Sequence, residues 1–190
     1  METTKAALAH YVVDTKASRF TAQAFVTGIL SAVGHNPIIG IRNFSGDVHF
    51  SPEALQGSEF HLNIKAASLS VQDDIPDKDR REIERLMNEQ VLETTKYPEI
   101  VYHAPAISIT KLGDSLYSAA LDGTLNFHGV TCRQPVTAHI AVFGAMVRAS
   151  GGFTLKQIDY QIKPISVAGG ALKLKDELKF SFEMVVREQE

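Results

Sequence analysis

The feature that most constrains this chain is a near-strict alternation of apolar and polar residues close to its C-terminus. From residue 178 to residue 186 every second side chain is apolar, namely Leu178, Phe180, Phe182, Met184 and Val186. Of the four residues between them, only Val185 is apolar. Successive side chains of a strand point to opposite faces, so this pattern predicts a long strand with one apolar face and one mostly solvated face.

The same alternation recurs along most of the chain, in ten candidate segments that together predict about eight or nine strands. The other candidate strands are His10–Asp14, Arg19–Thr27, Asn43–Phe50, Glu59–Lys65, Glu99–His103, Ile107–Lys111, Leu116–Phe127, Val130–Phe143 and Met146–Leu155. Turn-forming pairs such as Gly113-Asp114, His128-Gly129 and Gly169-Gly170 separate segments of this kind. The sequence therefore predicts an antiparallel sheet.

A sheet with one apolar face must stack on a second sheet or close on itself. Two neighbouring candidates, Leu116–Phe127 and Val130–Phe143, are longer than ordinary strands and favour a tall barrel over a compact sandwich. No repeat or linker divides the chain, so we expect a single domain over residues 1–190. The pattern therefore predicts an all-β fold and favours a barrel, and an eight-stranded barrel is just wide enough for side chains or one slender ligand.

One segment departs from the strand pattern and predicts a short amphipathic helix. Between Asp77 and Asn88, the apolar residues Ile83, Leu86 and Met87 recur at helical spacing. Asp77 is the expected N-cap, since Asp accepts hydrogen bonds from free backbone amides at a helix start. A further helical turn is expected over Ser51–Gln56.

Charge and cysteine content exclude several classes of protein. The 190 residues carry 19 Lys and Arg against 22 Asp and Glu, a formal charge of −3, which offers no basis for nucleic-acid binding. No run of apolar residues is long enough for a transmembrane helix. The apolar patch at Ala6–Ala9 is too short for a signal peptide, so a soluble cytoplasmic protein is expected. The single cysteine, Cys132, predicts a small apolar strand residue and no internal disulfide.

Histidine is the residue type that most invites a metal hypothesis. If Asn43–Phe50 pairs with Glu59–Lys65 so that Phe50 faces Phe60, His49 faces His61 on the outside, and Asp47 is the one further ligand in that row. A zinc site needs three or four ligands, so no metal site is predicted. His128-Gly129 is explained by a tight turn that places Leu125 opposite Cys132. The sequence holds no GxSxG, HExxH or CxxC motif.

Several segments, taken together and in order, resemble the YceI-like, polyisoprenoid-binding family. They are Tyr11-Val-Val-Asp14, Ser18-Arg-Phe20, Phe44-Ser-Gly46, Val48-His-Phe50, Ala67-Ser-Leu69, Val91-Leu92, Lys96-Tyr-Pro-Glu-Ile100 and the segment 121–130, LDGTLNFHGV. The resemblance implies an all-β fold, a closed antiparallel eight-stranded lipocalin-like barrel around a long apolar cavity that holds a polyisoprenoid or the tail of an isoprenoid quinone. It also implies that the helix lies near the mouth of the barrel. The segment Ser31–Pro37 departs from the common pattern, and within it His35 is a candidate polar contact.

These patterns lead to a set of candidate cavity residues, on the assumption that the apolar strand faces point inward. A register change of one residue would turn the whole set outward. The candidates are Phe20, Phe44, Val48, Phe60, Leu62, Leu125, Phe127, Phe180 and Phe182, with Ile83 and Met87 at the entrance.

The function expected from the sequence is non-enzymatic binding or transport of a long isoprenoid-like molecule, with no required cofactor. One alternative is an enzyme that acts on an apolar substrate, with His35, His103 or His128 as general base. Another is a ligand-free structural or metal-handling barrel. A homodimer that pairs through exposed barrel faces is a further expectation.

Overall fold

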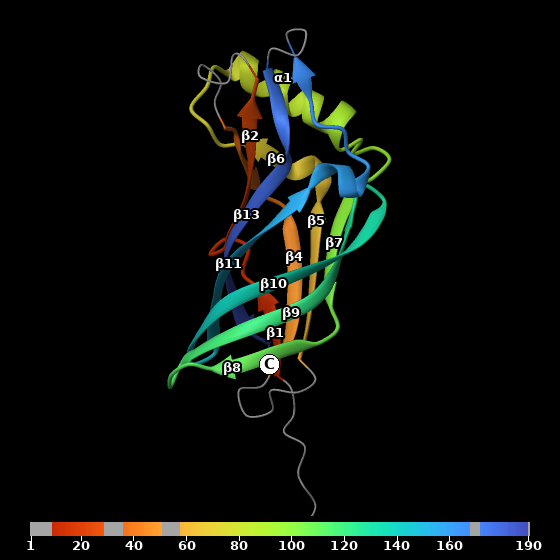
Figure 1. Ribbon diagram of the computed structural model, residues 1–190. Helices are drawn as coiled ribbons and strands as arrows, with labels where there is room; N and C mark the ends of the chain where they lie inside the picture. The colour runs from red at the N-terminus through yellow and green to blue at the C-terminus, as the bar shows by residue number, and fades with distance from the viewer. Residues whose placement is uncertain (1–8, 29–35, 51–57, 168–171, 190) are drawn as a thin grey trace, which may run out of the picture.

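The chain forms an antiparallel sheet that closes into a barrel (Figure 1). The computed structural model describes residues 9–28, 36–50, 58–167 and 172–189. Eight strands form the ring in the order β1-β4-β5-β7-β9-β10-β11-β13, and pairing of β1 with β13 closes it. The predicted closed antiparallel eight-stranded barrel is confirmed.

The ring strands have the following bounds: β1 (Ala9–Val13), β4 (Phe44–Phe50), β5 (Glu59–Lys65), β7 (Glu99–Ala104), β9 (Leu116–Phe127), β10 (Val130–Phe143), β11 (Met146–Lys156) and β13 (Leu172–Glu188). Other strands extend the wall: β2 (Arg19–Thr27), β3 (Ile38–Ile41), β6 (Leu69–Val71), β8 (Ile107–Lys111) and β12 (Ser166–Val167). The helical segments are η1 (Ala66–Ser68), α1 (Asp77–Leu86), η2 (Met87–Val91) and η3 (Gln157–Tyr160).

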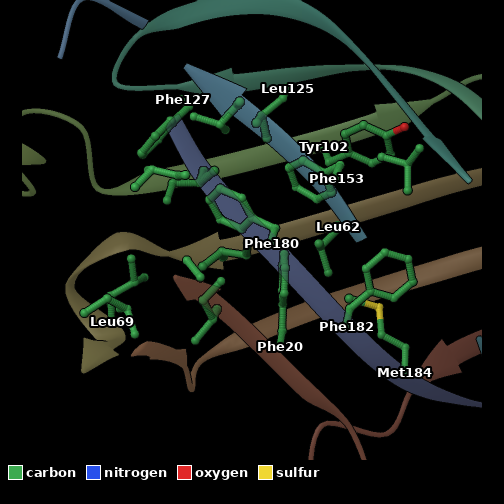
Figure 2. A pocket seen from close by; sticks show the side chains of 18 of the residues that line it. Phe20, Leu62, Leu69, Tyr102, Leu125, Phe127, Phe153, Phe180, Phe182 and Met184 are labelled. Carbon is green, nitrogen blue, oxygen red and sulfur yellow. The ribbon is translucent and has the colours of Figure 1, made fainter. Parts of the chain in front are cut away.

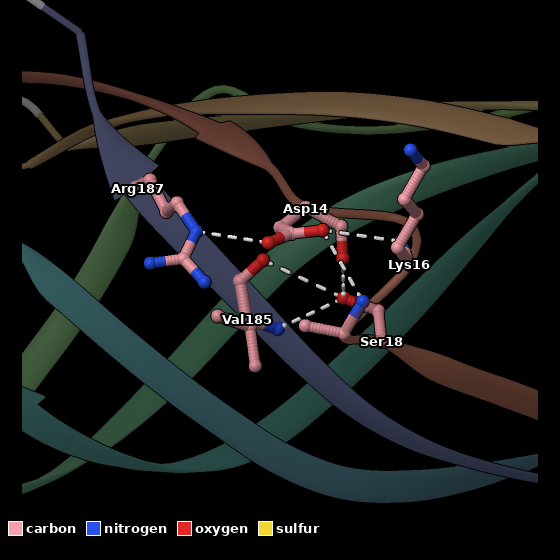
Figure 3. A network of polar contacts seen from close by, with 6 residues as sticks. Asp14, Lys16, Ser18, Val185 and Arg187 are labelled. Atoms are coloured by element: carbon pink, nitrogen blue, oxygen red, sulfur yellow. Dashed lines mark hydrogen bonds and ion pairs between the residues drawn. The ribbon is translucent and has the colours of Figure 1, made fainter.

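One long strand, β13, holds the barrel together by pairing with two strands in succession. Its residues 186–188 pair with β1, and its residues 173–183 pair with β2. The chain turns between β1 and β2 at Asp14, whose carboxylate accepts hydrogen bonds from the Lys16 backbone amide (3.1 Å) and from Nε of Arg187 on β13 (2.8 Å; Figure 3). Ser18 Oγ donates to the Asp14 carbonyl (2.7 Å) and accepts from the Val185 amide (2.9 Å). These contacts hold the turn between β1 and β2 against β13.

The alternating face of β13 points inward, as its pattern predicts. Leu178, Phe180, Phe182, Met184 and Val186 all lie among the side chains that surround the barrel interior. Because strand side chains alternate, the intervening residues point outward. The sequence pattern therefore fixes the inner face of the barrel correctly.

The register predicted for β4 and β5 is wrong by two residues. Phe44 lies opposite Ile64 and Val48 opposite Phe60, whereas the prediction placed Phe50 opposite Phe60. The apolar pattern repeats every two residues, so it determines which face of the strand points inward. It cannot distinguish pairing registers that differ by an even number of residues. As a result His49 lies opposite Glu59, and the expected pairing of His49 with His61 does not form.

The hairpin turn predicted at His128-Gly129 is confirmed. Phe127 pairs with Val130 and Leu125 with Cys132, which leaves two residues in the loop. Their φ angles are 51° for His128 and 75° for Gly129, both in the left-handed region that tight hairpins require. A Cβ atom on Gly129 would lie 2.5 Å from the Tyr97 ring, so close packing also demands glycine here.

The predicted helix is present and covers one end of the barrel, opposite the C-terminus (Figure 1). We call this the helix end. The N-cap is Pro76, not Asp77 as predicted; Asp77 is the first helical residue, where its charge favours the helix dipole. The helix continues through η2 and so ends three residues beyond the predicted Asn88. The turn expected over Ser51–Gln56 lies outside the described residues.

Candidate ligand-binding cavity

The barrel interior holds an apolar cavity of about 240 Å³. All eight ring strands contribute lining side chains, and β2, β3, β6, β8, α1, η2 and η3 contribute others. Aliphatic and aromatic residues converge on this space from opposite walls (Figure 2). The described lining contains no Asp, Glu, Lys, Arg, His or Cys. Such a cavity can bury a hydrocarbon but offers no charged group to a ligand.

An aromatic cluster forms the middle of the lining. The ring of Phe20 on β2 lies 6.1 Å from that of Phe180 and 6.4 Å from those of Phe44 and Phe182 (centroid distances; Figure 2 shows Phe20, Phe180 and Phe182). Phe153 stacks on Phe180 at 4.7 Å, with the ring planes within 2° of parallel. Aromatic pairs at these separations stabilise each other by about 1 kcal/mol beyond simple burial.

Tyr102 contributes an aromatic ring to the lining while its hydroxyl is bound within the wall. The Tyr102 hydroxyl donates a hydrogen bond to the Gln134 backbone oxygen at 3.0 Å, passing over Gly123 of the intervening strand β9. Burial, with a smaller contribution from the nearby Asp122 carboxylate, raises the pKa of Tyr102 to about 12. The side chain is therefore neutral at physiological pH, and it presents no free hydroxyl to a ligand.

Gln157 is the lining residue that carries a polar amide. It begins η3, is 3% exposed, and donates from Nε2 to the Lys175 backbone oxygen at 2.9 Å. Sequence reasoning missed it because η3 follows β11 directly and the alternation of period two stops there. A lone Gln next to an Ile and an Asp carries no signal that would mark it as buried.

The helix end of the cavity is formed by α1 and η2. Ile83 and Met87 both line the cavity, as predicted, and Ile83 is 38% exposed, so it reaches from the lining to solvent. Arg80 holds α1 in place by donating to the backbone oxygens of Val71 (3.2 Å) and Asp73 (3.1 Å). The helix is thereby attached to the end of β6.

Ten of the eleven predicted cavity residues lie in the lining, and Phe44 does not. The ten are Phe20, Val48, Phe60, Leu62, Ile83, Met87, Leu125, Phe127, Phe180 and Phe182. Phe44 is buried, but it packs edge-on against Phe20, which lines the cavity in its place. His35 lies outside the described residues. Contact of any of these side chains with a ligand stays a prediction.

Sequence reasoning also missed small lining residues, among them Ala22, Ala24, Ala119, Ala138 and Ala149. The alternation itself could have found them. Ala119, for example, shares the inward face of β9 with Leu125 and Phe127. Alanine attracts little notice in a search for large apolar side chains, yet small residues at the wall are what leave space inside it.

The described histidines lie away from the cavity. His103 stacks on His61 at 4.0 Å and His10 on His49 at 4.8 Å, in positions that the strand alternation turns outward. His128 is 10% exposed and has both ring nitrogens engaged, Nε2 with the Glu93 carboxylate (2.8 Å) and Nδ1 with the Tyr160 backbone oxygen (3.2 Å). Neither His103 nor His128 can act as a base on a molecule inside the barrel from these positions.

Within the described ranges, no group of three or more His, Cys, Asp or Glu side chains is arranged to hold a metal ion. No helix in that part of the chain combines the length and the apolar character needed to cross a membrane.

The closed barrel, its continuous apolar cavity and the helix over one end define a lipocalin-like barrel. Residues 11–186 match the YceI-like domain, and the chain belongs to this family. No curated protein matches the sequence.

Solved structures share this fold at low sequence identity. BcnA of Burkholderia cenocepacia is 18% identical with a TM-score of 0.69, over 91% of this chain and 98% of that one. A polyisoprenoid binding domain from Saccharophagus degradans, implicated in plant cell wall breakdown, is 16% identical with a TM-score of 0.70, over 96% and 99%. The Campylobacter jejuni YceI protein is 16% identical with a TM-score of 0.58, over 80% and 85%.

Proposed function

We propose that this protein binds a long, slender, isoprenoid-like molecule inside its barrel and acts as a carrier, not as an enzyme. The observation that carries the proposal is the cavity inside the barrel, whose described lining is apolar apart from Gln157 and the tyrosine hydroxyls. The Saccharophagus degradans domain with the same fold is named as polyisoprenoid binding, which supports the same class of ligand here.

The size of the cavity favours a narrow chain. A volume of about 240 Å³ lies just below the range of roughly 300–1,000 Å³ found for drug-sized ligands. An unbranched or methyl-branched hydrocarbon fits such a space better than a fused ring system does.

Burial supplies the binding energy. Each buried CH₂ group contributes about 0.8 kcal/mol, so three isoprene units of fifteen carbons contribute roughly 12 kcal/mol before the costs of association and ordering. If these costs take a third of it, about 8 kcal/mol remains, which corresponds to a Kd of about 1 µM. No polar contact is needed for affinity at this level.

The enzymatic alternative has no general base in the described lining, which lacks histidine, cysteine and carboxylates. We therefore propose no catalytic reaction.

The purified protein should yield an isoprenoid on organic extraction, or should bind one when it is offered. Native mass spectrometry before and after incubation with geranylgeraniol tests this directly, and a protein that stays empty contradicts the proposal.

A matched pair of variants tests whether the barrel interior is the site. Ala149 on β11 lines the cavity, whereas Ala141 on β10 does not and faces outward. Ala149→Leu places about three extra carbons in the cavity and should lower isoprenoid binding at least tenfold, while Ala141→Leu should leave it unchanged. Equal binding by both variants would place the ligand elsewhere.

A further inference from the structure

The cavity amide of Gln157 is held in one orientation. Its Nε2 donates to the Lys175 backbone oxygen at 2.9 Å, and only the nitrogen end of an amide can donate to a carbonyl. The side-chain oxygen Oε1 is therefore the end of the amide that is left for another partner, and no hydrogen bond to it comes from the described residues. Gln157 is 3% exposed and lines the cavity. A ligand hydroxyl that reaches Oε1 can therefore donate a hydrogen bond to it.

Gln157 lies toward the helix end of the barrel. In the same η3 turn, the Tyr160 backbone oxygen contacts His128, which also binds Glu93, just beyond η2. The next lining residues along the sequence are Ile162, Ile165 and Leu174, all apolar. A chain that enters beside α1 would therefore meet one polar group near its outer end and hydrocarbon along the rest of its length.

We propose that Gln157 sets the chemical class of the ligand's polar end. The inference rests on the proposed function, namely that the cavity binds a long isoprenoid-like chain. Oε1 can accept a hydrogen bond from the hydroxyl of a prenyl alcohol or of a quinol. An ether, an ester or a quinone carries only acceptors at this end, and it leaves Oε1 without a partner. A carboxylate or a pyrophosphate is disfavoured further, because its charge would be buried beside an acceptor and without a cation.

Two probe molecules isolate this interaction. Geranylgeraniol and geranylgeranyl methyl ether share the same chain, but only the alcohol can donate a hydrogen bond. Delipidated full-length protein is offered an equal mixture of the two, and native mass spectrometry gives the ratio of bound alcohol to bound ether. The ratio is measured for the wild type, for Gln157→Met, which keeps the side-chain length but removes the amide, and for Leu174→Met.

The alcohol-to-ether ratio should fall about five- to tenfold from wild type to Gln157→Met, since one buried hydrogen bond contributes about this factor. Leu174→Met changes the same region without a polar group and should keep the wild-type ratio. Gln157→Leu replaces Gln157→Met if the latter does not fold.

Three outcomes would overturn the inference. A ratio that is the same within twofold in wild type and Gln157→Met shows that the amide does not discriminate. An equal fall in Gln157→Met and Leu174→Met assigns the effect to packing. If the wild type binds neither probe, the proposed function itself is overturned, and the inference falls with it. This outcome differs from the first two, in which the wild type still binds a probe.

Discussion

Gly123 should be irreplaceable because the Tyr102 side chain crosses directly over it. A Cβ atom at position 123 would lie 2.4 Å from the Tyr102 hydroxyl oxygen and 2.8 Å from the His103 backbone oxygen. In Gly123→Ala the Tyr102 ring must therefore move, and its hydrogen bond to the Gln134 backbone oxygen must break. Overpacking costs about 2 kcal/mol and the lost buried hydrogen bond about 1 kcal/mol, so the free energy of unfolding should fall by about 3 kcal/mol.

A double-mutant cycle tests this cause specifically. Tyr102→Leu removes the ring and hydroxyl, so only the contact with the His103 backbone oxygen remains to oppose a methyl group at position 123. In that background Gly123→Ala should cost about 1 kcal/mol, which gives a coupling energy of about 2 kcal/mol. Urea denaturation of the four proteins measures it. If Gly123→Ala costs the same in both backgrounds to within about 0.5 kcal/mol, Tyr102 is not the reason for glycine at this position.

Two other predictions concern the connections between strands. The hydrogen bond from Arg187 is the main cause that lowers the pKa of Asp14, so Asp14 stabilises the fold only while ionised. Denaturation at several pH values measures how much more stable the wild type is than Asp14→Asn. This difference should be at its full size above pH 3.8, the ordinary pKa of Asp, and should disappear as the pH falls through the lower pKa of Asp14 in the folded protein. A difference that does not change with pH would contradict this. Gly129→Ala forces a side chain into φ = 75° against Tyr97, and should lower the Tm by about 5 °C in a thermal melt, equivalent to about 2 kcal/mol.

The sequence was most informative where one local rule decides the structure. Alternation of period two determines which strand residues point inward, so Phe180 and Phe182 could be placed in the lining without any knowledge of strand order. The His128-Gly129 turn was equally predictable, because a two-residue hairpin requires left-handed φ angles.

Other features depend on contacts between distant segments, and these were not predictable. A shift of two residues between β4 and β5 leaves the apolar faces unchanged, so the pattern could not choose between His61 and Glu59 as the partner of His49. Phe44 shows the same limit, because its exclusion from the lining depends on where Phe20 of another strand lies. Gln157 is buried by the Lys175 backbone, eighteen residues away in sequence, and nothing in its local sequence indicates that contact.

The volume of the cavity favours the proposed binding of a ligand. Residual cavity volume in a protein core costs about 24 cal/mol per Å³, so an empty space of about 240 Å³ costs roughly 6 kcal/mol. That is comparable with the whole stability of an ordinary domain. Larger side chains at small lining positions such as Ala119, Ala138 and Ala149 could fill this space, yet alanine stands there. A ligand that fills the space returns the lost contacts and stabilises the folded state by mass action, so occupancy and stability are coupled in this barrel. The same coupling explains why a substitution such as Ala149→Leu is expected to oppose ligand binding without unfolding the protein.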